Sequence, residues 1–207
     1  MPRIFLVRHG ETLWNKESRY QGQLDIPLSD VGKIQALKLA KRFSRENISA
    51  IFSSDLSRAY ETARIINMFH NKTIIKAPNL RELCFGKWEG KTYEELVREV
   101  GDEYINWLKN PFYLKPPEGE SLADLISRIT SVFYDILKMY NEDENIILVT
   151  HGGPIKAFIS AILEINTAVF FKLKIGNASV TEIFADGFGE LKDIAYIVKI
   201  NDTCHLK

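Results

Sequence analysis

The sequence predicts an α/β fold, a three-layer α-β-α sandwich with a mostly parallel central sheet. Short apolar runs alternate with amphipathic stretches along the whole chain, as in sheets covered by helices on both faces. The run over residues 4–7 is continuously apolar, which is typical of a strand buried on both faces, and residues 145–149 read as another apolar strand. The 207 residues are enough for one domain with a full core. We therefore expect a single domain over residues 1–207.

The first half of the chain predicts three strands and two helices. The first strand, residues 4–7, ends at Arg8-His9-Gly10 and leads into a polar loop. Ser29 offers an N-cap for a helix in which apolar residues recur at helical spacing up to Phe43. Residues 50–52 and 73–76 read as further strands, and residues 55–69 as the second helix.

The second half begins with a capping box, in which Thr92 precedes Glu95 and opens a helix through Val100. Residues 107–120 fit no regular pattern and predict a loop. Within residues 84–120 we expect a lid or insertion. The remaining predicted elements are a helix capped by Ser121, a strand over 145–149, a helix with Pro154 at its first position that continues over 155–163, and antiparallel strands over 180–185 and 191–200.

Composition excludes several classes of protein. The 27 Lys and Arg residues balance 27 Asp and Glu residues, which argues against a nucleic-acid-binding module. The apolar stretch at the N-terminus is too short for a signal peptide, and no window approaches the ~18 apolar residues of a membrane span. Cys84 and Cys204 lie far apart, as expected of two reduced thiols in a cytoplasmic protein.

Two histidines occupy the same local context. His9 and His151 each follow an apolar strand and precede a glycine, which permits a tight turn. In parallel sheets, ligands bind beyond the carboxyl ends of the strands. A single such histidine is often a hydrogen-bonded structural residue, but the matched placement of two favours a functional site.

Charged residues near these histidines suggest the ligand. Arg8 adjoins His9, and Arg58 follows the predicted second strand, so both guanidinium groups can face the same crevice. Arginine binds oxyanions in two-point fashion, which indicates a pocket for a dianion such as phosphate. Glu82 is the carboxylate we nominate to protonate a leaving alkoxide, although most glutamates in a chain are simply solvated.

A metal site is the competing interpretation. His9, His151, Glu11 and Asp25 are its candidate ligands. No HExxH, paired-carboxylate or cysteine-rich spacing supports it, and two arginines would repel a cation. We therefore predict no metal.

Several motifs, in order, resemble those of the histidine phosphatase superfamily, also called phosphoglycerate mutase-like. They cover nearly the whole chain. The matching segments are residues 6–15 (Leu-Val-Arg-His-Gly-Glu-Thr, then Trp-Asn), 20–36, 53–63, 81–90, 119–121 and 149–153. The resemblance implies a phosphoglycerate mutase-like fold and phosphoryl-transfer chemistry without a metal.

The resemblance also implies roles for individual residues. His9 would be the nucleophile that becomes phosphohistidine, and Glu82 the group that protonates the leaving oxygen and then activates water. Arg8, Arg58 and His151 would hold the phosphoryl oxygens. Asn15, Gln21, Gly22 and Gly152 complete the expected substrate-binding set, which also includes Arg8, Arg58, Glu82 and His151.

The family contains phosphatases and mutases, and the compact chain is more similar to the bacterial small-phosphatase branch. That branch includes broad-specificity, alpha-ribazole and metal-independent phosphoserine phosphatases. We expect a phosphomonoesterase for small phosphate esters, without cofactor and without a nucleic-acid or membrane partner. The alternatives are a phosphoglycerate mutase that needs a bisphosphoglycerate primer, and a non-catalytic phosphate-binding module.

Three features stay open at this level. Residues 108–119 offer several apolar side chains, either as a lid over the substrate or as a loop that packs on itself. His205 is interpreted as a structural residue of the C-terminal tail. The resemblance allows a homodimer, although no segment shows an unsatisfied apolar edge.

Overall fold

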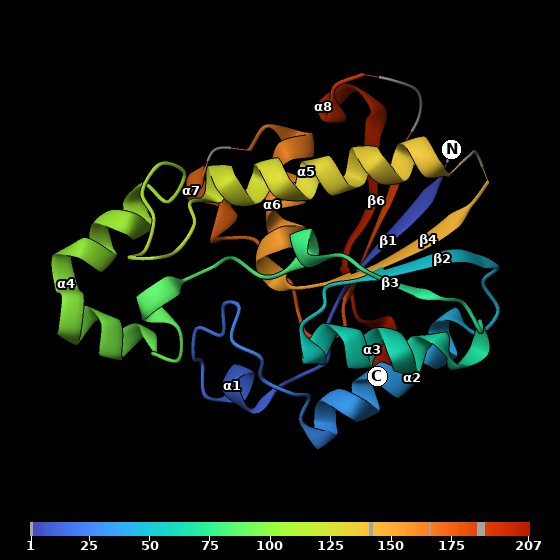
Figure 1. Ribbon diagram of the computed structural model, residues 1–207, viewed down its shortest axis with the longest axis horizontal. Coiled ribbons are helices and arrows are strands. Elements are labelled where there is room, and N and C mark those ends of the chain that lie inside the picture. Colours follow the sequence, from blue (N-terminus) through green and yellow to red (C-terminus); the bar gives the residue numbers. More distant parts are fainter. Residues whose placement is uncertain (1, 141–142, 166, 186–188) are drawn as a thin grey trace.

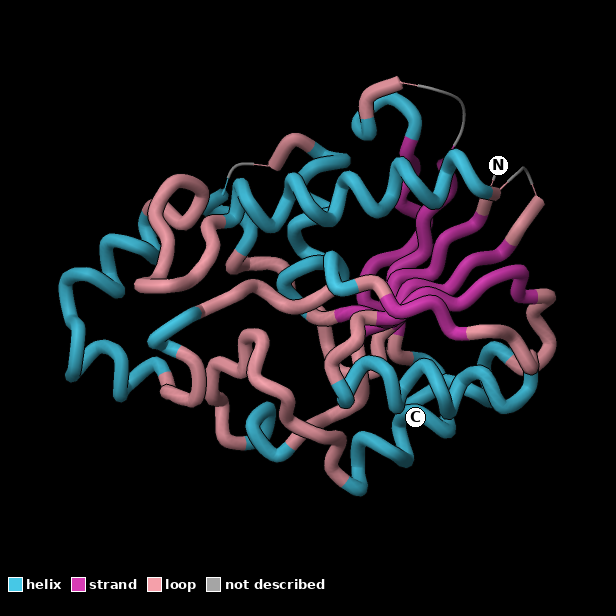
Figure 2. The backbone as a smooth tube through the Cα atoms, viewed as in Figure 1, coloured by secondary structure: helices cyan, strands magenta, loops and turns pink. Residues whose placement is uncertain are grey.

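The computed structural model describes residues 2–140, 143–165, 167–185 and 189–207. Six strands form one sheet in the order β3-β2-β4-β1-β5-β6 (Figure 2). The four strands on one side are mutually parallel, whereas β5 pairs antiparallel with both β1 and β6. The strands are β1 (Arg3–Arg8), β2 (Ile48–Ser53), β3 (Ile74–Lys76), β4 (Asn145–Thr150), β5 (Val180–Ala185) and β6 (Ala195–Asp202).

Helices cover both faces of this sheet (Figure 1). Helices α2 (Asp30–Phe43) and α3 (Ser57–Ile66) pack on one face, where they bury Phe5 and Val7 of β1. Helices α5 (Leu122–Met139) and α6 (Gly152–Leu163) pack on the other face, against Ile4 and Leu6. Side chains of one strand therefore enter two cores alternately. The predicted α/β fold, with three layers and a mostly parallel sheet, is confirmed.

Residues 84–120 form an excursion at one side of the sheet, and α4 (Tyr93–Lys109) is its main helix (green in Figure 1). The predicted helix end at Val100 was wrong. A break at Gly101, with φ at +32°, interrupts the helical pattern, but the chain continues as helix to Lys109. Tyr104 and Trp107 are buried in the second half, so tertiary packing maintains a helix that the local pattern does not reveal.

Other boundaries also differ from the prediction. Helix α3 begins at Ser57, because the carboxylate of Asp55 pairs with Arg81 instead of opening the helix. Pro154 occupies the third position of α6 rather than the first, which costs no hydrogen bond because first-turn amides have no intrahelical partner. Residues 191–194 form a helical turn, and β6 starts only afterwards.

The remaining elements are short. Within the described residues, no helix is long and apolar enough to cross a bilayer. Cys84 and Cys204 are both free thiols. The short elements are α1 (Leu13–Lys16), α7 (Thr167–Phe170), α8 (Leu191–Ile194) and the 3-10 turns η1 (Asn67–Phe69), η2 (Pro78–Leu80), η3 (Gly86–Trp88) and η4 (Cys204–Leu206).

Candidate active site

The carboxyl ends of β1 and β4 bring the two predicted histidines together. The amide of His9 donates to the carbonyl of Thr150 at 3.0 Å, which continues the strand pairing to the end of β1. The imidazole rings of His9 and His151 then lie with their centroids 5.0 Å apart. Both residues are almost fully buried. The structure thus brings together the two histidines that the topological argument placed at one crevice.

His9 is held in one tautomer. Its Nδ1 lies 2.7 Å from the carbonyl oxygen of Gly10, which can only accept, so Nδ1 carries the proton. Nε2 is left with the lone pair. Burial, together with the positive charges of Arg58 and Arg8, holds the pKa of His9 well below its usual range. His9 is therefore a neutral imidazole with one nucleophilic nitrogen.

His151 has both ring nitrogens engaged. Nδ1 accepts from Nε of Arg58 at 3.2 Å, which leaves the proton on Nε2, 2.9 Å from the hydroxyl of Ser54. Burial and the charge of Arg58 lower the pKa of His151 as well. A direct hydrogen bond from His151 to a phosphoryl oxygen would have to replace its contact with Ser54.

The two predicted arginines supply fixed positive charge. Arg58 is fully buried, and its terminal nitrogens donate to the carbonyl oxygens of Gly22 and Leu24, each at 2.7 Å. Burial lowers its pKa to about 10, with Glu82 opposing the shift, so Arg58 stays charged at neutral pH. Arg8 donates to the carbonyl of Ile175 at 2.5 Å, and its buried Nε has no partner. An unpartnered guanidinium nitrogen is suited to an incoming oxyanion.

The predicted substrate-binding residues lie around this charge. Oδ1 of Asn15 accepts from Thr12 and Asn177, which turns the amide nitrogen of Asn15 into the available donor. Gly22 has φ at +51°, and a Cβ there would lie 1.9 Å from Oε1 of Glu89. Glycine is therefore required at this position. Gln21 is buried beside it, and its Oε1 has no partner.

Glu82 reaches the same place from the segment after η2. Its carboxylate accepts from the amide of Gly153 at 3.0 and 3.2 Å and from the amide of Leu83 at 2.8 Å. Gly153 is the second residue of α6, so the carboxylate sits at a helix N-terminus, where negative charge is favoured. The Glu82 carboxylate lies so close to the backbone at Gly153 that a Cβ there would be 2.1 Å from Oε1 of Glu82. Glycine at position 153 therefore permits this contact.

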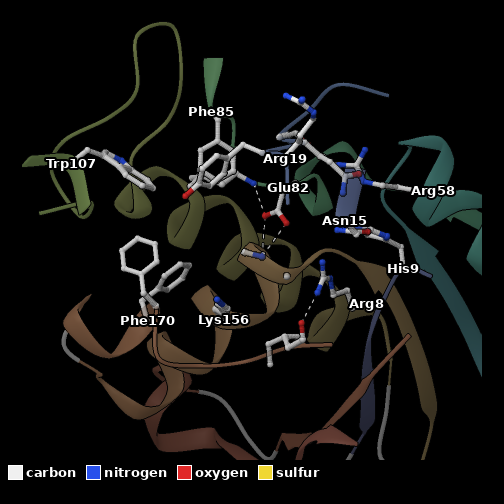
Figure 3. A pocket seen from close by; sticks show the side chains of 18 residues that line it. Arg8, His9, Asn15, Arg19, Arg58, Glu82, Phe85, Trp107, Lys156 and Phe170 are labelled. Atoms are coloured by element: carbon white, nitrogen blue, oxygen red, sulfur yellow. Dashed lines mark hydrogen bonds between the residues drawn. The ribbon is translucent and has the colours of Figure 1, made fainter. Parts of the chain in front are cut away.

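These groups line one cavity of about 310 Å³ (Figure 3). In Figure 3 the polar side chains of His9, Asn15 and Arg58 lie at one end of the cavity and the rings of Trp107 and Phe170 at the other. Of the predicted site residues, all except the fully buried His151 line it. The lining residues are Arg8, His9, Asn15, Arg19, Tyr20, Gln21, Gly22, Arg58, Glu82, Leu83, Phe85, Trp107, Gly152, Gly153, Lys156, Phe170, Phe171 and Ile175.

The predicted lid region contributes only in part. Phe85 and Trp107, from the 84–120 excursion, line the cavity. None of residues 108–119 does so. Phe112 packs instead on Tyr113 and accepts a backbone hydrogen bond from Ala123 at the start of α5. Residues 108 and 109 end α4, and residues 110–119 form a loop that packs on its own apolar residues and on α5.

Sequence reasoning missed Lys156. It lies one helical turn after Gly153 in α6, and its side chain points into the cavity (Figure 3). Its ammonium lies 5.5 Å from the ring centroid of Phe170, and burial lowers its pKa against the opposing effect of Glu82. The spacing of three residues after Gly153 was the signal available in the sequence.

The candidate metal ligands do not form one group. Glu11 is bound to the hydroxyl of Ser29, and Asp25 caps the amide of Ser57. Among the described residues, no three His, Cys, Asp or Glu side chains lie close enough together to hold a metal ion. His205 bridges Arg42 and the carbonyl of Ala178, in keeping with its interpretation as a structural residue.

Fold and site together define a class of enzyme. Residues 4–194 match the family model of the histidine phosphatase superfamily, branch 1. The chain therefore belongs to the histidine phosphatase superfamily.

Similar proteins within this superfamily include phosphatases and a mutase. The chain is 34% identical to phosphoserine phosphatase 1 of Hydrogenobacter thermophilus, over 100% of this chain and 95% of that protein. It is 32% identical to a probable phosphoglycerate mutase, GpmB, of Yersinia pestis, with the same coverage of each chain. Among solved structures, a phosphoserine phosphatase mutant of Entamoeba histolytica in complex with phosphoserine superposes with a TM-score of 0.87, at 31% identity and full coverage of both chains.

Proposed function

We propose that the protein is a phosphomonoesterase that hydrolyses small phosphate esters through a phosphohistidine at His9. The observation that carries this proposal is the fixed tautomer of His9, which leaves Nε2 as a nucleophile in a cavity lined by Arg8, Arg58 and Glu82. Two permanent cations beside a neutral imidazole fit a phosphoryl dianion.

In the first step, Nε2 of His9 attacks phosphorus and forms a P–N bond while the ester P–O bond breaks. Glu82, in its protonated form, gives its proton to the departing alcohol oxygen. Arg8, Arg58 and the amide nitrogen of Asn15 hold the non-bridging oxygens, whose charge develops toward the transition state. The geometry of the cavity supports each of these assignments.

In the second step, the Glu82 carboxylate takes a proton from a water molecule that attacks phosphorus. The P–N bond breaks, inorganic phosphate leaves, and His9 and protonated Glu82 are restored. Both steps need Glu82 beside the phosphoryl group, and the hydrogen bond from the amide of Gly153, which fixes its carboxylate at the cavity, supports this placement. Because the arginines offset the charge, no metal enters this sequence of steps.

The substitution His9→Ala tests the nucleophile. We expect loss of hydrolysis of phosphoserine and p-nitrophenyl phosphate, no effect of a chelator on the parent enzyme, and phosphate trapped on His9 by rapid acid-free quenching and mass spectrometry. His70→Ala is the matched control, since His70 lies at η1, outside the cavity. Hydrolysis retained by His9→Ala, or the absence of a phosphorylated His9, would refute the nucleophile assignment. Binding of phosphate esters by a parent protein that hydrolyses none of them would favour the non-catalytic phosphate-binding role.

A phosphoglycerate mutase is the second candidate, because one relative at 32% identity carries that name. Interconversion of 3- and 2-phosphoglycerate in the presence of a bisphosphoglycerate primer, with little phosphate release, would favour it.

For the phosphatase, the similarity to phosphoserine phosphatases makes phosphoserine the first ester to test. The two free thiols support a reducing, cytoplasmic location.

A further inference from the structure

The carboxylate of Glu82 is carried by a segment without regular structure. Residues 82–85 belong to no helix or strand, so no ladder of backbone hydrogen bonds fixes them. The contacts of Glu82 with Gly153 and Leu83 hold only its carboxylate. The main chain is held in part by Gln23 and Glu89, which bind the carbonyl of Glu82 and the amide of Phe85. Further contacts come from two side chains outside the cavity.

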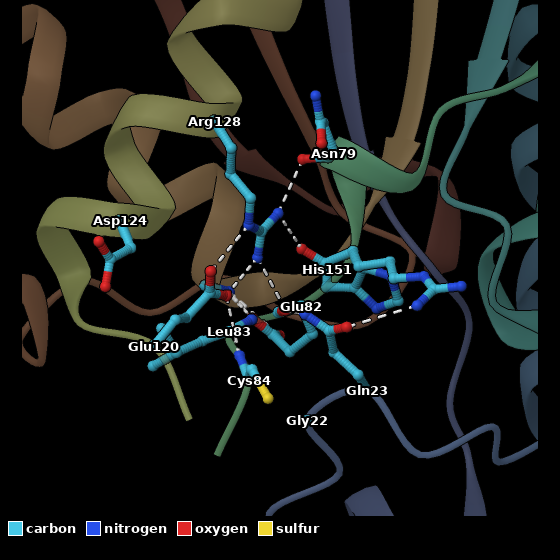
Figure 4. Close-up of polar contacts among 12 residues, drawn as sticks. Gly22, Gln23, Asn79, Glu82, Leu83, Cys84, Glu120, Asp124, Arg128 and His151 are labelled. Carbon is cyan, nitrogen blue, oxygen red and sulfur yellow. Dashed lines mark hydrogen bonds and ion pairs between the residues drawn. The ribbon is translucent and has the colours of Figure 1, made fainter. Parts of the chain in front are cut away.

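One arginine of α5 contacts three carbonyl groups in this segment and just before it (Figure 4). Nη1 of Arg128 donates to the carbonyl oxygens of Asn79 and Arg81, each at 2.7 Å, and Nη2 donates to the carbonyl oxygen of Glu82 at 2.9 Å. Three carbonyl groups within four residues thus converge on one guanidinium group. Its planar fork fixes the directions of the donors as well as their distances.

Glu120 in turn fixes Arg128. Its carboxylate accepts from Nε at 3.0 Å and from Nη2 at 2.5 Å, a bidentate pair in which both side chains are less than one-fifth exposed. Glu120 also pairs with Cys84, whose amide donates to its carboxylate at 2.9 Å and whose carbonyl accepts from its backbone amide at 3.0 Å. We call Arg128 and Glu120 the clamp. The clamp binds backbone groups before Glu82, at Asn79 and Arg81, and after it, at Cys84.

The clamp lies outside the cavity. Neither Arg128 nor Glu120 is among the lining residues, and Figure 4 shows both on the α5 side of the segment. The start of α5 is fixed by the capping box of Ser121 and Asp124, which lie between Glu120 and Arg128 in the chain. The clamp is therefore anchored at α5, and its hydrogen bonds reach the cavity through the main chain that carries Glu82.

We propose that the clamp is a positioning device for proton transfer, in which Arg128 holds the main chain of Glu82 at the place from which its carboxyl group reaches the leaving oxygen. This inference rests on the proposed function. Its consequence is selective: loosening the clamp slows esters whose alcohol must be protonated as it leaves, and spares esters whose leaving group departs as a stable anion.

The test compares kcat/KM for phosphoserine, which releases an alkoxide, with kcat/KM for p-nitrophenyl phosphate, which releases a stable phenolate. For Arg128→Met we expect a loss of about 10²-fold with phosphoserine and a loss of less than about threefold with p-nitrophenyl phosphate. Glu82→Gln sets the full extent of this selectivity. Combining the two substitutions should add little to Glu82→Gln alone, because both act on one proton transfer.

Arg3→Met is the matched control. Arg3 also forms a partly buried ion pair, with Glu182 at 2.6 Å, but at the amino end of β1, away from the cavity. We expect it to lower stability while leaving the ratio of the two kcat/KM values unchanged. Arg128→Lys and Glu120→Gln carry the same test if Arg128→Met does not fold, and each should show a smaller loss of the same selectivity.

The outcomes separate the two proposals. Equal losses for both esters in folded clamp variants, or no loss, would overturn the positioning role, provided that Glu82→Gln remains selective. Failure of the parent enzyme to hydrolyse either ester through His9 would instead overturn the proposed function. A loss selective for phosphoserine in the clamp variants and in Glu82→Gln, but not in Arg3→Met, supports the positioning role of the clamp.

Discussion

Replacing Gly153 by alanine tests how closely α6 and the carboxylate of Glu82, the proposed acid–base group, are fitted to each other. A Cβ at this position would lie 2.1 Å from Oε1 of Glu82 and 3.2 Å from its Cδ. Since an ordinary contact requires ~3.4 Å or more, the carboxylate must retreat by about 1 Å. The amide of Gly153 would then also lose its two hydrogen bonds to Glu82.

The expected effect on catalysis is large for a single methyl group. A displacement of about 1 Å from a productive geometry can cost about 10²-fold in rate, which corresponds to ~2.7 kcal/mol of transition-state stabilisation. Stability should not fall in parallel, because alanine is favoured over glycine by roughly 0.5–1 kcal/mol in a helix. Gly153→Ala should therefore lose activity without losing thermal stability.

The assay is kcat/KM for phosphoserine, or for the best ester of a small panel, measured beside the melting temperature. In a Glu82→Gln background the same change should cost less than about threefold, because the proton transfer it disturbs is already absent. A Gly153→Ala enzyme within threefold of the parent would refute the reasoning. So would a loss of equal size in both backgrounds.

Two further predictions concern charge in the cavity. Lys156→Met should lower kcat/KM about tenfold more for phosphoserine than for phosphoethanolamine, because only phosphoserine offers a carboxylate to the ammonium group of Lys156. Lys156→Arg should restore part of this preference for phosphoserine. Equal losses for both esters would contradict the prediction. Stability should fall as pH drops from 7 to 5.5. The pKa values of His9 and His151 are depressed in the fold, so the unfolded chain binds more protons below about pH 6.5, which costs up to roughly 1 kcal/mol for each histidine. Urea unfolding at the two pH values measures this loss of stability. His9→Ala should remove part of it, because His70 and His205, whose pKa values are also lowered in the fold, contribute as well.

Several elements of the fold were accessible from local pattern. The apolar runs that became β1 and β4 are buried on both sides of the sheet, so their sequences carry an unbroken signal. Ser29 and Ser121 were recognised as N-caps because capping depends on a side chain and the backbone three residues on. The end of α4 was missed because packing of Trp107, which is distant information, maintains the helix beyond Gly101.

For the site, the sequence indicated which residues meet but not how they are oriented. The strand-end argument brought His9, His151, Arg8 and Arg58 to one edge of the sheet, where the structure has them. It could not foresee that both nitrogens of His151 are already engaged, since that depends on the rotamers of Arg58 and Ser54. Contacts among the polar residues of the cavity are decided by side-chain packing.

By itself, the sequence determined an α/β architecture, the strand ends that form the site and the residue types that fit a phosphoryl group. Periodicity and turn chemistry are local, and the rule for parallel sheets turns them into a location. Only the tertiary structure decided the tautomer of His9, the entry of Lys156 into the cavity and the grip of Arg128 on the main chain of Glu82. These depend on contacts between residues far apart in the chain, and hydrogen bonds of that kind act only over the last few ångströms.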